Sequence, residues 1–259
     1  MAVTPDGCYM AVLYYSESKL RVYRIEADCT LTLLHTCGGE GAGPKQFNHP
    51  YKMCLAPNGN LLVSDIGNNR VQELTGLGET EPAHVRDLKV TNPRTIAVHG
   101  DMVAVGTEDA TVVLLSYATG AIIRTFGSRG TGRGDIGNSA GGLRFTLDGV
   151  YILVAEGSND RLSKFCVSDG TFVDCYCEGQ VSGSGSHDIE IAPSGEVIVL
   201  VSAADRVCVF SADGRILLRD WRTLGRPGDS DFQCPIALAL ANSKLFVLVA
   251  NSPCVLVFE

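Results

Sequence analysis

The sequence predicts an all-β chain, a six-bladed β-propeller of four-stranded antiparallel blades whose last blade lacks its outer strand. Two observations predict this fold. A pattern of one apolar stretch, a tight turn and a second apolar run recurs six times in 259 residues. No segment shows a sustained helical period. The composition, with 45% hydrophobic and 19% charged residues, is that of a chain with a buried core and excludes a disordered protein.

The turns are the most regular part of the repeat. Most of them combine Asp, Asn or Ser with glycine, which permits the positive φ values that short hairpins require. The sixth copy, at residues 238–243, ends on Asn-Ser and has lost its glycine. The five turn glycines are Gly7, Gly59, Gly100, Gly149 and Gly195.

A second strand follows each turn, and a third follows after a polar break. The second strands are almost wholly apolar, as in residues 197–201, which indicates burial on both faces between neighbouring blades. The outer strands, such as residues 215–221, mix polar and apolar residues because they meet solvent. Together the repeats form one propeller domain over residues 1–259. The expected blades are residues 1–40, 41–90, 91–134, 135–183, 184–230 and 231–259.

The two ends of the sequence predict that this chain is a fragment of a longer protein. Met1 opens almost inside an inner strand, and the last blade stops after its third strand. The strand expected at residues 254–258 would then expose unpaired N–H and C=O groups along one edge. We expect an extension at either end to raise the melting temperature.

Residues 40–74 carry the most specific motif. They combine a glycine-rich start, Gln-Phe-x-x-Pro, Pro-x-Gly and Asp-x-x-Asn-x-Arg. This segment resembles the NHL repeat, a family of propeller blades. The resemblance implies that the carboxylate, amide and guanidinium brace the turn between the second and third strands, where a carboxylate accepts backbone N–H groups. The positions that match this structural motif are Asp65, Asn68, Arg70, Glu156, Arg161 and Arg206.

Strand direction sorts the loops onto two faces of the propeller. The outer-to-inner and second-to-third connections share one face and include the long loops, whereas the other face carries tight turns. Binding residues concentrate in long loops on a rigid scaffold, so this long-loop face is the candidate binding face. The candidate binding residues are Lys45, Phe47, His49, Asn68, Arg129, Arg133, His187, Arg226 and Phe232.

Charge and cysteine content limit the ligands and the compartment. A net charge of −8 argues against nucleic acid as the partner. No apolar run is long enough for a bilayer-spanning helix, so we expect no membrane association. The ten cysteines contain no C-x-x-C pair, which removes the usual zinc pattern and favours reduced thiols in a cytoplasmic protein. We expect no cofactor.

These observations favour a scaffold that binds a protein or peptide on the long-loop face. NHL propellers serve as substrate-recognition modules of tripartite-motif ubiquitin ligases, so the resemblance implies such a role within a larger protein. Two alternatives stay open: an RNA-binding propeller, and a metal-dependent lyase or hydrolase with its site at the central channel. For the latter, His49 and His187 are the candidate metal ligands, with Asp188 and Glu190 beside His187. A third histidine in register and any complete catalytic motif are missing from the sequence, so we do not expect an enzyme.

Overall fold

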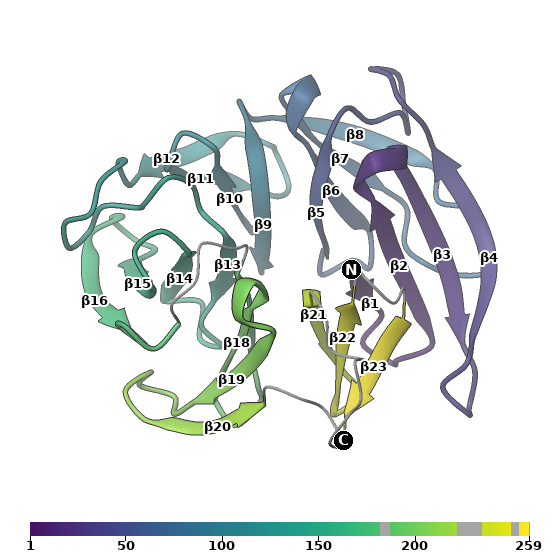
Figure 1. Ribbon diagram of the computed structural model, residues 1–259. Coiled ribbons are helices and arrows are strands. Elements are labelled where there is room, and N and C mark those ends of the chain that lie inside the picture. The colour runs from purple at the N-terminus through teal and green to yellow at the C-terminus, as the bar shows by residue number, and fades with distance from the viewer. Residues whose placement is uncertain (182–186, 222–234, 250–253, 259) are drawn as a thin grey trace.

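The computed structural model describes residues 1–181, 187–221, 235–249 and 254–258, which form six blades in a ring (Figure 1). Five blades have four antiparallel strands and the last has three. The inner strands of consecutive blades contact one another around the whole ring, including β21 (Pro235–Ala241) with β1 (Ala2–Val3). The predicted six-bladed propeller with a three-stranded last blade is therefore confirmed.

The chain starts each blade at the innermost strand and moves outward. Blades 1 and 2 consist of β1, β2 (Tyr9–Tyr14), β3 (Lys19–Ile25) and β4 (Leu31–Gly38), then β5 (Pro50–Leu55), β6 (Leu61–Asp65), β7 (Arg70–Leu74) and β8 (His84–Lys89). Blades 3 and 4 consist of β9 (Pro93–His99), β10 (Met102–Thr107), β11 (Val112–Ser116) and β12 (Ile122–Phe126), then β13 (Gly142–Phe145), β14 (Tyr151–Glu156), β15 (Arg161–Cys166) and β16 (Phe172–Tyr176). Blades 5 and 6 consist of β17 (His187–Ile191), β18 (Val197–Val201), β19 (Arg206–Phe210) and β20 (Leu217–Trp221), then β21, β22 (Lys244–Val249) and β23 (Cys254–Phe258).

Among the described residues, short 3-10 helices join the second and third strands of three blades. They are η1 (Tyr15–Glu17) in blade 1, η2 (Ile66–Asn68) in blade 2 and η3 (Ser202–Ala204) in blade 5. Within the described ranges no helix is long and apolar enough to cross a membrane.

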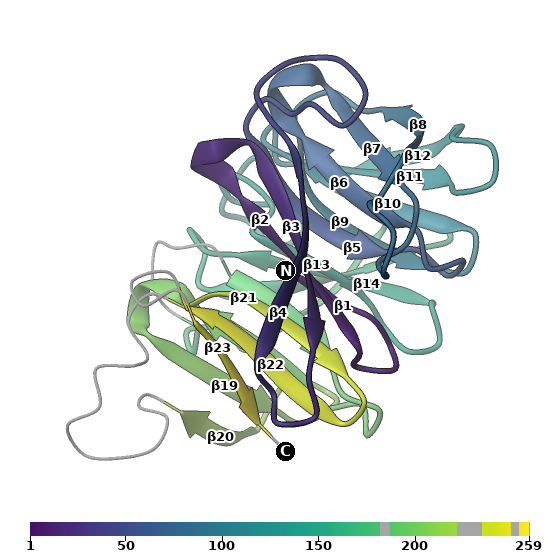
Figure 2. The same ribbon diagram turned by 90° about the vertical axis from the view of Figure 1, so that its right-hand side faces the viewer.

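The hydrophobic core is divided into six clusters, one between each pair of neighbouring blades. β6 shows why the second strands are apolar throughout, since all five of its residues are buried. Leu61 and Val63 pack toward blade 1, whereas Leu62 packs toward blade 3. In Figure 2 the strands of blade 6 lie next to those of blade 1, where the sixth cluster closes the ring. Both faces of each blade are thus buried, as expected for strands without a polar side.

The hairpin turns have the backbone conformation that the sequence predicts. All five turn glycines have positive φ, for example +72° at Gly7 and +84° at Gly59. In the sixth turn, between β21 and β22, Asn242 and Ser243 take φ values of +48° and +59°. The last hairpin therefore has a two-residue turn in which two non-glycine residues adopt the positive φ values of a type I′ turn, which strains the backbone.

Three inner strands begin with a proline and carry a β-bulge directly after it. The register slips between Pro50 and Met53 in β5, after Pro93 in β9, and between Pro235 and Ala237 in β21. Proline cannot donate to the ladder, which confines it to strand ends and bulges. A bulge redirects the side chains next to it, and in β5 it includes Lys52, which lines the central cavity.

The first four blades are also linked at their rims. Each outer strand carries a bulge, and a side chain beside the bulge contacts the following blade. The contacts are His35 with the carbonyl of Glu79, Arg86 with that of Ala118, Arg124 with that of Ser168, and Asp174 with the guanidinium of Arg215. These contacts connect each of the first four blades to the following blade at the rim, outside the apolar clusters.

Candidate functional site

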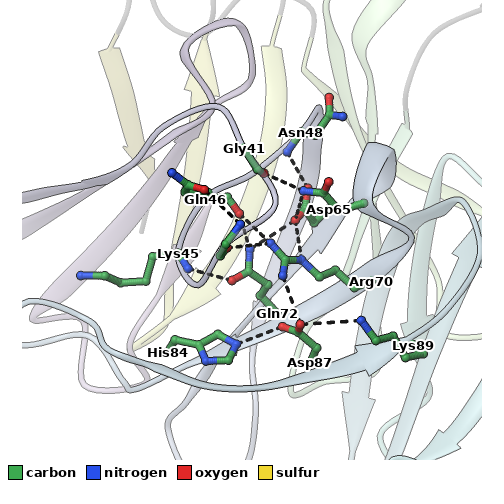
Figure 3. Close-up of polar contacts among 12 residues, drawn as sticks. Gly41, Lys45, Gln46, Asn48, Asp65, Arg70, Gln72, His84, Asp87 and Lys89 are labelled. Atoms are coloured by element: carbon green, nitrogen blue, oxygen red, sulfur yellow. Dashed lines mark hydrogen bonds and ion pairs between the residues drawn. The ribbon is translucent and has the colours of Figure 1, made fainter.

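Asp65 lies fully buried at the end of β6, below the loop that leads into β5 (Figure 3). Its Oδ1 accepts the backbone N–H of Asn48 at 2.6 Å. Its Oδ2 accepts the Asn68 side-chain amide at 2.9 Å and the Arg70 Nε–H at 2.8 Å. A buried carboxylate is stable only with such a full set of donors. The hydrogen-bonding capacity of the Asp65 carboxylate is therefore used within the fold.

Arg70 connects Asp65 to the neighbouring loop and to Asp87 on β8. Its Nη2 donates to the carbonyls of Gly43 and Gln46, both at 2.9 Å. Its Nη1 donates to Asp87 at 3.1 Å. Burial raises the pKa of Asp87, but the hydrogen bond from His84 and the charge of Arg70 outweigh it and lower the pKa overall. The loop over residues 41–48, which we call the blade-2 leading loop, is thus held by side chains of its own blade.

Blade 4 repeats the same arrangement. Glu156 accepts the Asn159 side-chain amide at 2.6 Å and Arg161 Nε at 3.3 Å. Arg161 then donates to the carbonyl of Asp135 at 3.1 Å in the corresponding leading loop. Each leading loop, residues 41–48 in blade 2 and 130–137 in blade 4, has a parallel bridge at the equivalent place, Glu40 with Phe47 and Arg129 with Ile136. We call each such set of contacts a brace.

Blade 5 has only the arginine of the brace. Its second strand ends in Val201 where blade 2 has a carboxylate, and Arg206 pairs instead with Asp220 through two contacts of 3.1 Å. Of the positions that match the repeat motif, the structure thus brings together Asp65, Asn68 and Arg70 in blade 2, and Glu156 with Arg161 in blade 4.

The prediction that Phe47 belongs to the binding face is wrong. Its side chain is completely buried in the cluster between blades 1 and 2. An added Cβ on Gly38 would lie 3.0 Å from the Phe47 ring, so the ring packs closely against that glycine. Phe47 lies in a long loop, but its ring points into the core because Gly38 of the preceding blade has no side chain there.

Several other candidates of the long-loop face have partners within the chain. Lys45 forms an ion pair with Glu81, and Arg129 donates to the carbonyl of Glu108. Arg133 pairs with Glu178, although 61% of its side chain is exposed. Arg226, Phe232 and the side chain of His187 lie outside the described residues.

Of the two candidate metal ligands, only the side chain of His49 is described. His49 is exposed, and its ring lies 5.6 Å from that of Tyr15. Among the described residues no group of three or more His, Cys, Asp or Glu side chains is placed to hold a metal ion. The eight cysteines whose side chains are described are free thiols.

The most distinctive site lies at the centre of the ring. A cavity of about 220 Å³ is lined by residues from all six inner strands. Charged side chains come from three of these strands, which belong to three different blades. They are Lys52 on β5, Arg144 on β13, and Asp188 and Glu190 on β17. We call these four residues the channel cluster.

The channel cluster forms two ion pairs. Lys52 Nζ lies 2.7 Å from Asp188 Oδ2, which joins blade 2 to blade 5 across the ring. Arg144 pairs with Glu190 between blades 4 and 5. Asp188 Oδ2 also accepts the backbone N–H of Leu238 at 3.0 Å. Charges that would be costly in an apolar core are here balanced around an open volume.

Burial and charge shift the titration of this cluster. Burial raises the pKa of Asp188, but Lys52 and the bond from Leu238 outweigh it, so the pKa lies below its ordinary value. Burial lowers the pKa of the Arg144 guanidinium, and the charge of Asp188 opposes that shift. The Met1 amino group lies in the same channel, where burial and repulsion from Lys52 lower its pKa to about 5. Asp188 is therefore ionised at neutral pH.

An aromatic–cation pair lies beside the channel cluster at the start of two inner strands. The guanidinium carbon of Arg94 lies 4.4 Å from the centre of the Tyr51 ring, and Arg94 Nη2 donates to the Tyr51 hydroxyl at 2.9 Å. Glu108 lies 3.9 Å from Arg94 Nη1. Tyr51 directly precedes Lys52, so the pair and the channel cluster share one bulge.

Motif reasoning did not find Lys52 and Arg144, and it noted Asp188 and Glu190 only as neighbours of His187. One signal was available. Strands buried on both faces are expected to be apolar, so a charged residue within one needs a partner or a role. Lys52 and Arg144 are such residues in the inner strands β5 and β13.

Comparisons with known proteins agree with the fold. Residues 1–217 match the family described as lactonase, 7-bladed beta-propeller. Two curated proteins of Lactococcus lactis, an uncharacterized protein of subsp. cremoris and the uncharacterized protein YwcC of subsp. lactis, are each 26% identical over 241 residues. Each match covers 82% of this chain and 70% of the relative.

A solved structure is similar in fold. It is a catalytically inactive variant of virginiamycin B lyase from Staphylococcus aureus with quinupristin, at 13% identity and a TM-score of 0.58, covering 92% of this chain and 75% of that one. The family description gives seven blades, whereas the described residues form six, and the matched span ends at the start of β20. These matches support a β-propeller family, and the resemblance of residues 40–74 to the NHL repeat stays a prediction.

Proposed function

The chain belongs to the lactonase family of β-propellers, and we propose that it hydrolyses a lactone in its central channel. The observation that carries the proposal is the channel cluster, because it combines two carboxylates and two cations around a cavity of about 220 Å³. Small-molecule sites are concave and hold a few converging polar groups, which this cavity does. This proposal differs from the binding scaffold that the sequence favours. The difference arises because no linear motif in the sequence marks the four residues of the channel cluster.

The two carboxylates differ in their surroundings. Asp188 is bound by Lys52 and by the N–H of Leu238, and its pKa is lowered. A carboxylate held in this way is a weak base, and its role is to keep Lys52 in place. Glu190 pairs with Arg144 through Oε1, and we assign its other oxygen, Oε2, to take a proton from water.

The reaction follows from these roles. The oxygen of a water molecule attacks the lactone carbonyl carbon while Glu190 takes one of its protons. Lys52 and Arg144 stabilise the negative charge that develops on the carbonyl oxygen. The bond between the acyl carbon and the ring oxygen then breaks, and the ring oxygen takes the proton back from Glu190. The product is an open-chain hydroxy acid, which releases its carboxyl proton to solvent.

Proton release tests this proposal directly. Hydrolysis of δ-gluconolactone or δ-valerolactone is followed in weakly buffered solution with a pH indicator. We expect hydrolysis above the uncatalysed rate, and a loss of about a hundred-fold or more in kcat for Lys52→Met and Glu190→Gln. Lys45→Met, which removes a lysine of the blade-2 leading loop, is the control and keeps the activity. A wild-type rate equal to the uncatalysed rate with a panel of lactones would overturn the proposal.

A second candidate is the recognition scaffold on the long-loop face, including the role within a ubiquitin ligase that the NHL resemblance implies. The observation that favours it is the pair of braces, which hold two leading loops in matching shapes. Loops that are ordered before binding pay less entropy when a partner docks. A purified partner that loses affinity for Lys45→Glu/Arg133→Glu, while lactone hydrolysis is unchanged, would favour this function over the first.

A further inference from the structure

We propose that Ser64 is a positioning residue of the central channel, and that its hydroxyl holds the bulge of β5 from which Lys52 reaches Asp188. Ser64 lies on β6, one layer behind the channel, and its side chain is completely buried. The kinetic part of this inference rests on the proposed hydrolysis, but its structural part does not.

Three contacts place the Ser64 hydroxyl at the bulge. Its Oγ accepts the backbone N–H of Lys52 at 2.8 Å. The same oxygen lies 3.1 Å from the carbonyl of Lys52 and 2.8 Å from the carbonyl of Arg94 on β9. One hydroxyl has one proton, so it donates to one carbonyl at a time, and the shorter contact is with Arg94. Ser64 therefore ties the backbone of Lys52 to blade 3.

The chain supplies an internal comparison for this position. Ser64 is the second-to-last residue of the second strand of its blade. The corresponding residues in the other five blades are Leu13, Gly106, Ala155, Leu200 and Leu248, and none of them has a hydroxyl. The bulges of β9 and β21 form opposite Gly106 and Leu248, so a bulge as such does not need one. The hydroxyl is present only in the blade whose inner strand sends a lysine across the channel.

The position of Lys52 determines how Asp188 titrates. The groups that face Asp188 are Lys52 on β5, the Met1 amino group, the N–H of Leu238 on β21, and Arg144 on β13. Lys52 is the strongest of the influences that lower its pKa, because its ammonium lies 2.7 Å away. If the bulge relaxes, Lys52 withdraws and the pKa of Asp188 rises. The pKa of Asp188 therefore indicates whether the β5 bulge holds Lys52 in place, and its measurement needs no substrate.

The test compares Ser64→Ala with Ser163→Ala. Ser163 is equally buried, but it lies on β15 of blade 4 and does not line the channel cavity. The carboxyl of Asp188 is titrated by carbon-detected NMR, and lactone hydrolysis is measured in parallel. For Ser64→Ala we expect a higher Asp188 pKa and a fall of about ten-fold in kcat with KM changed less than two-fold. For Ser163→Ala we expect both readouts to match the wild type.

Ser64→Thr provides the rescue, since it restores the hydroxyl, and it also serves if Ser64→Ala does not fold. We expect its Asp188 titration to match the wild type. An unchanged Asp188 pKa in Ser64→Ala, or an equally raised pKa in Ser64→Thr and Ser64→Ala, would overturn the inference. If the wild type hydrolyses no lactone but Ser64→Ala still shifts Asp188, the proposed function fails and the positioning role stands.

Discussion

The braces of blades 2 and 4 are built from buried ion pairs and the channel cluster from partly exposed ones, and the two are suited to different tasks. In the blade-2 brace, Asp65 and Arg70 are surrounded by backbone and side-chain groups that fill their hydrogen-bonding capacity. In the channel cluster, Lys52 and Asp188 border a cavity of about 220 Å³. The brace joins segments of one blade and its leading loop, whereas the cluster joins different blades across the ring.

This difference indicates which ion pairs can rearrange to bind a ligand and take part in a reaction. A pair whose hydrogen-bonding groups are all used within the fold cannot reorganise around a ligand without breaking the loop that it holds. A pair beside an open volume can exchange part of its contacts for those of a ligand or water. The motif that is easiest to recognise in this sequence is therefore structural, and the functional candidates lie where no motif marks them.

The largest effect is expected from Arg70→Leu. The substitution leaves Asp65 as a buried carboxylate without its cation, and breaking a buried pair in this way costs about 3–5 kcal/mol. Urea denaturation followed by fluorescence of the single tryptophan, Trp221, measures the free energy of unfolding. Arg161→Leu in blade 4 is the matched variant and should cost a similar amount. A loss below about 1 kcal/mol in both would show that the braces are not saturated pairs.

Asp188→Asn tests the ion pair of the channel cluster. The amide keeps the shape but removes the charge that holds Lys52, so we expect hydrolysis to fall by about a hundred-fold. The free energy of unfolding should fall less than in Arg70→Leu, because water in the cavity can solvate the freed ammonium. Kinetics and urea denaturation of the same preparation measure both effects. The comparison breaks if this variant is destabilised as much as Arg70→Leu while hydrolysis is kept.

A smaller effect is expected in the pH dependence of stability. The pKa of Asp188 is lowered in the folded chain, so its ionised form stabilises the fold above the unfolded pKa of about 3.9. That contribution is lost as the pH falls from this value through the folded pKa. Stability measured between pH 7 and pH 3 should therefore decline more steeply below pH 4 in the wild type than in Asp188→Asn. Parallel curves for the two proteins would contradict the lowered pKa.

Sequence reasoning was most successful where the structure is local. The turns, the six blades and the missing outer strand depend on residues that are near one another in the chain, and the structure confirms them. The inward position of Phe47 could not be predicted, because it depends on Gly38 of the preceding blade. The pairing within the channel cluster could not be predicted either, since Lys52 and Asp188 lie three blades apart and meet only when the ring closes. Periodicity predicts which strands form, but it does not predict which side chains meet across a channel.

The smallest effect is expected from Arg206→Leu in blade 5. Arg206 occupies the same place in its strand as Arg70, but Val201 replaces the buried carboxylate, and the partner Asp220 is on the outer strand with a quarter of its side chain exposed. After the substitution Asp220 can be solvated, so we expect a loss of about 1 kcal/mol or less. Urea denaturation next to Arg70→Leu and Arg161→Leu measures the difference. If Arg206→Leu costs as much as the other two, the strength of a brace comes from the arginine alone, and the distinction between a saturated and an open ion pair must be abandoned.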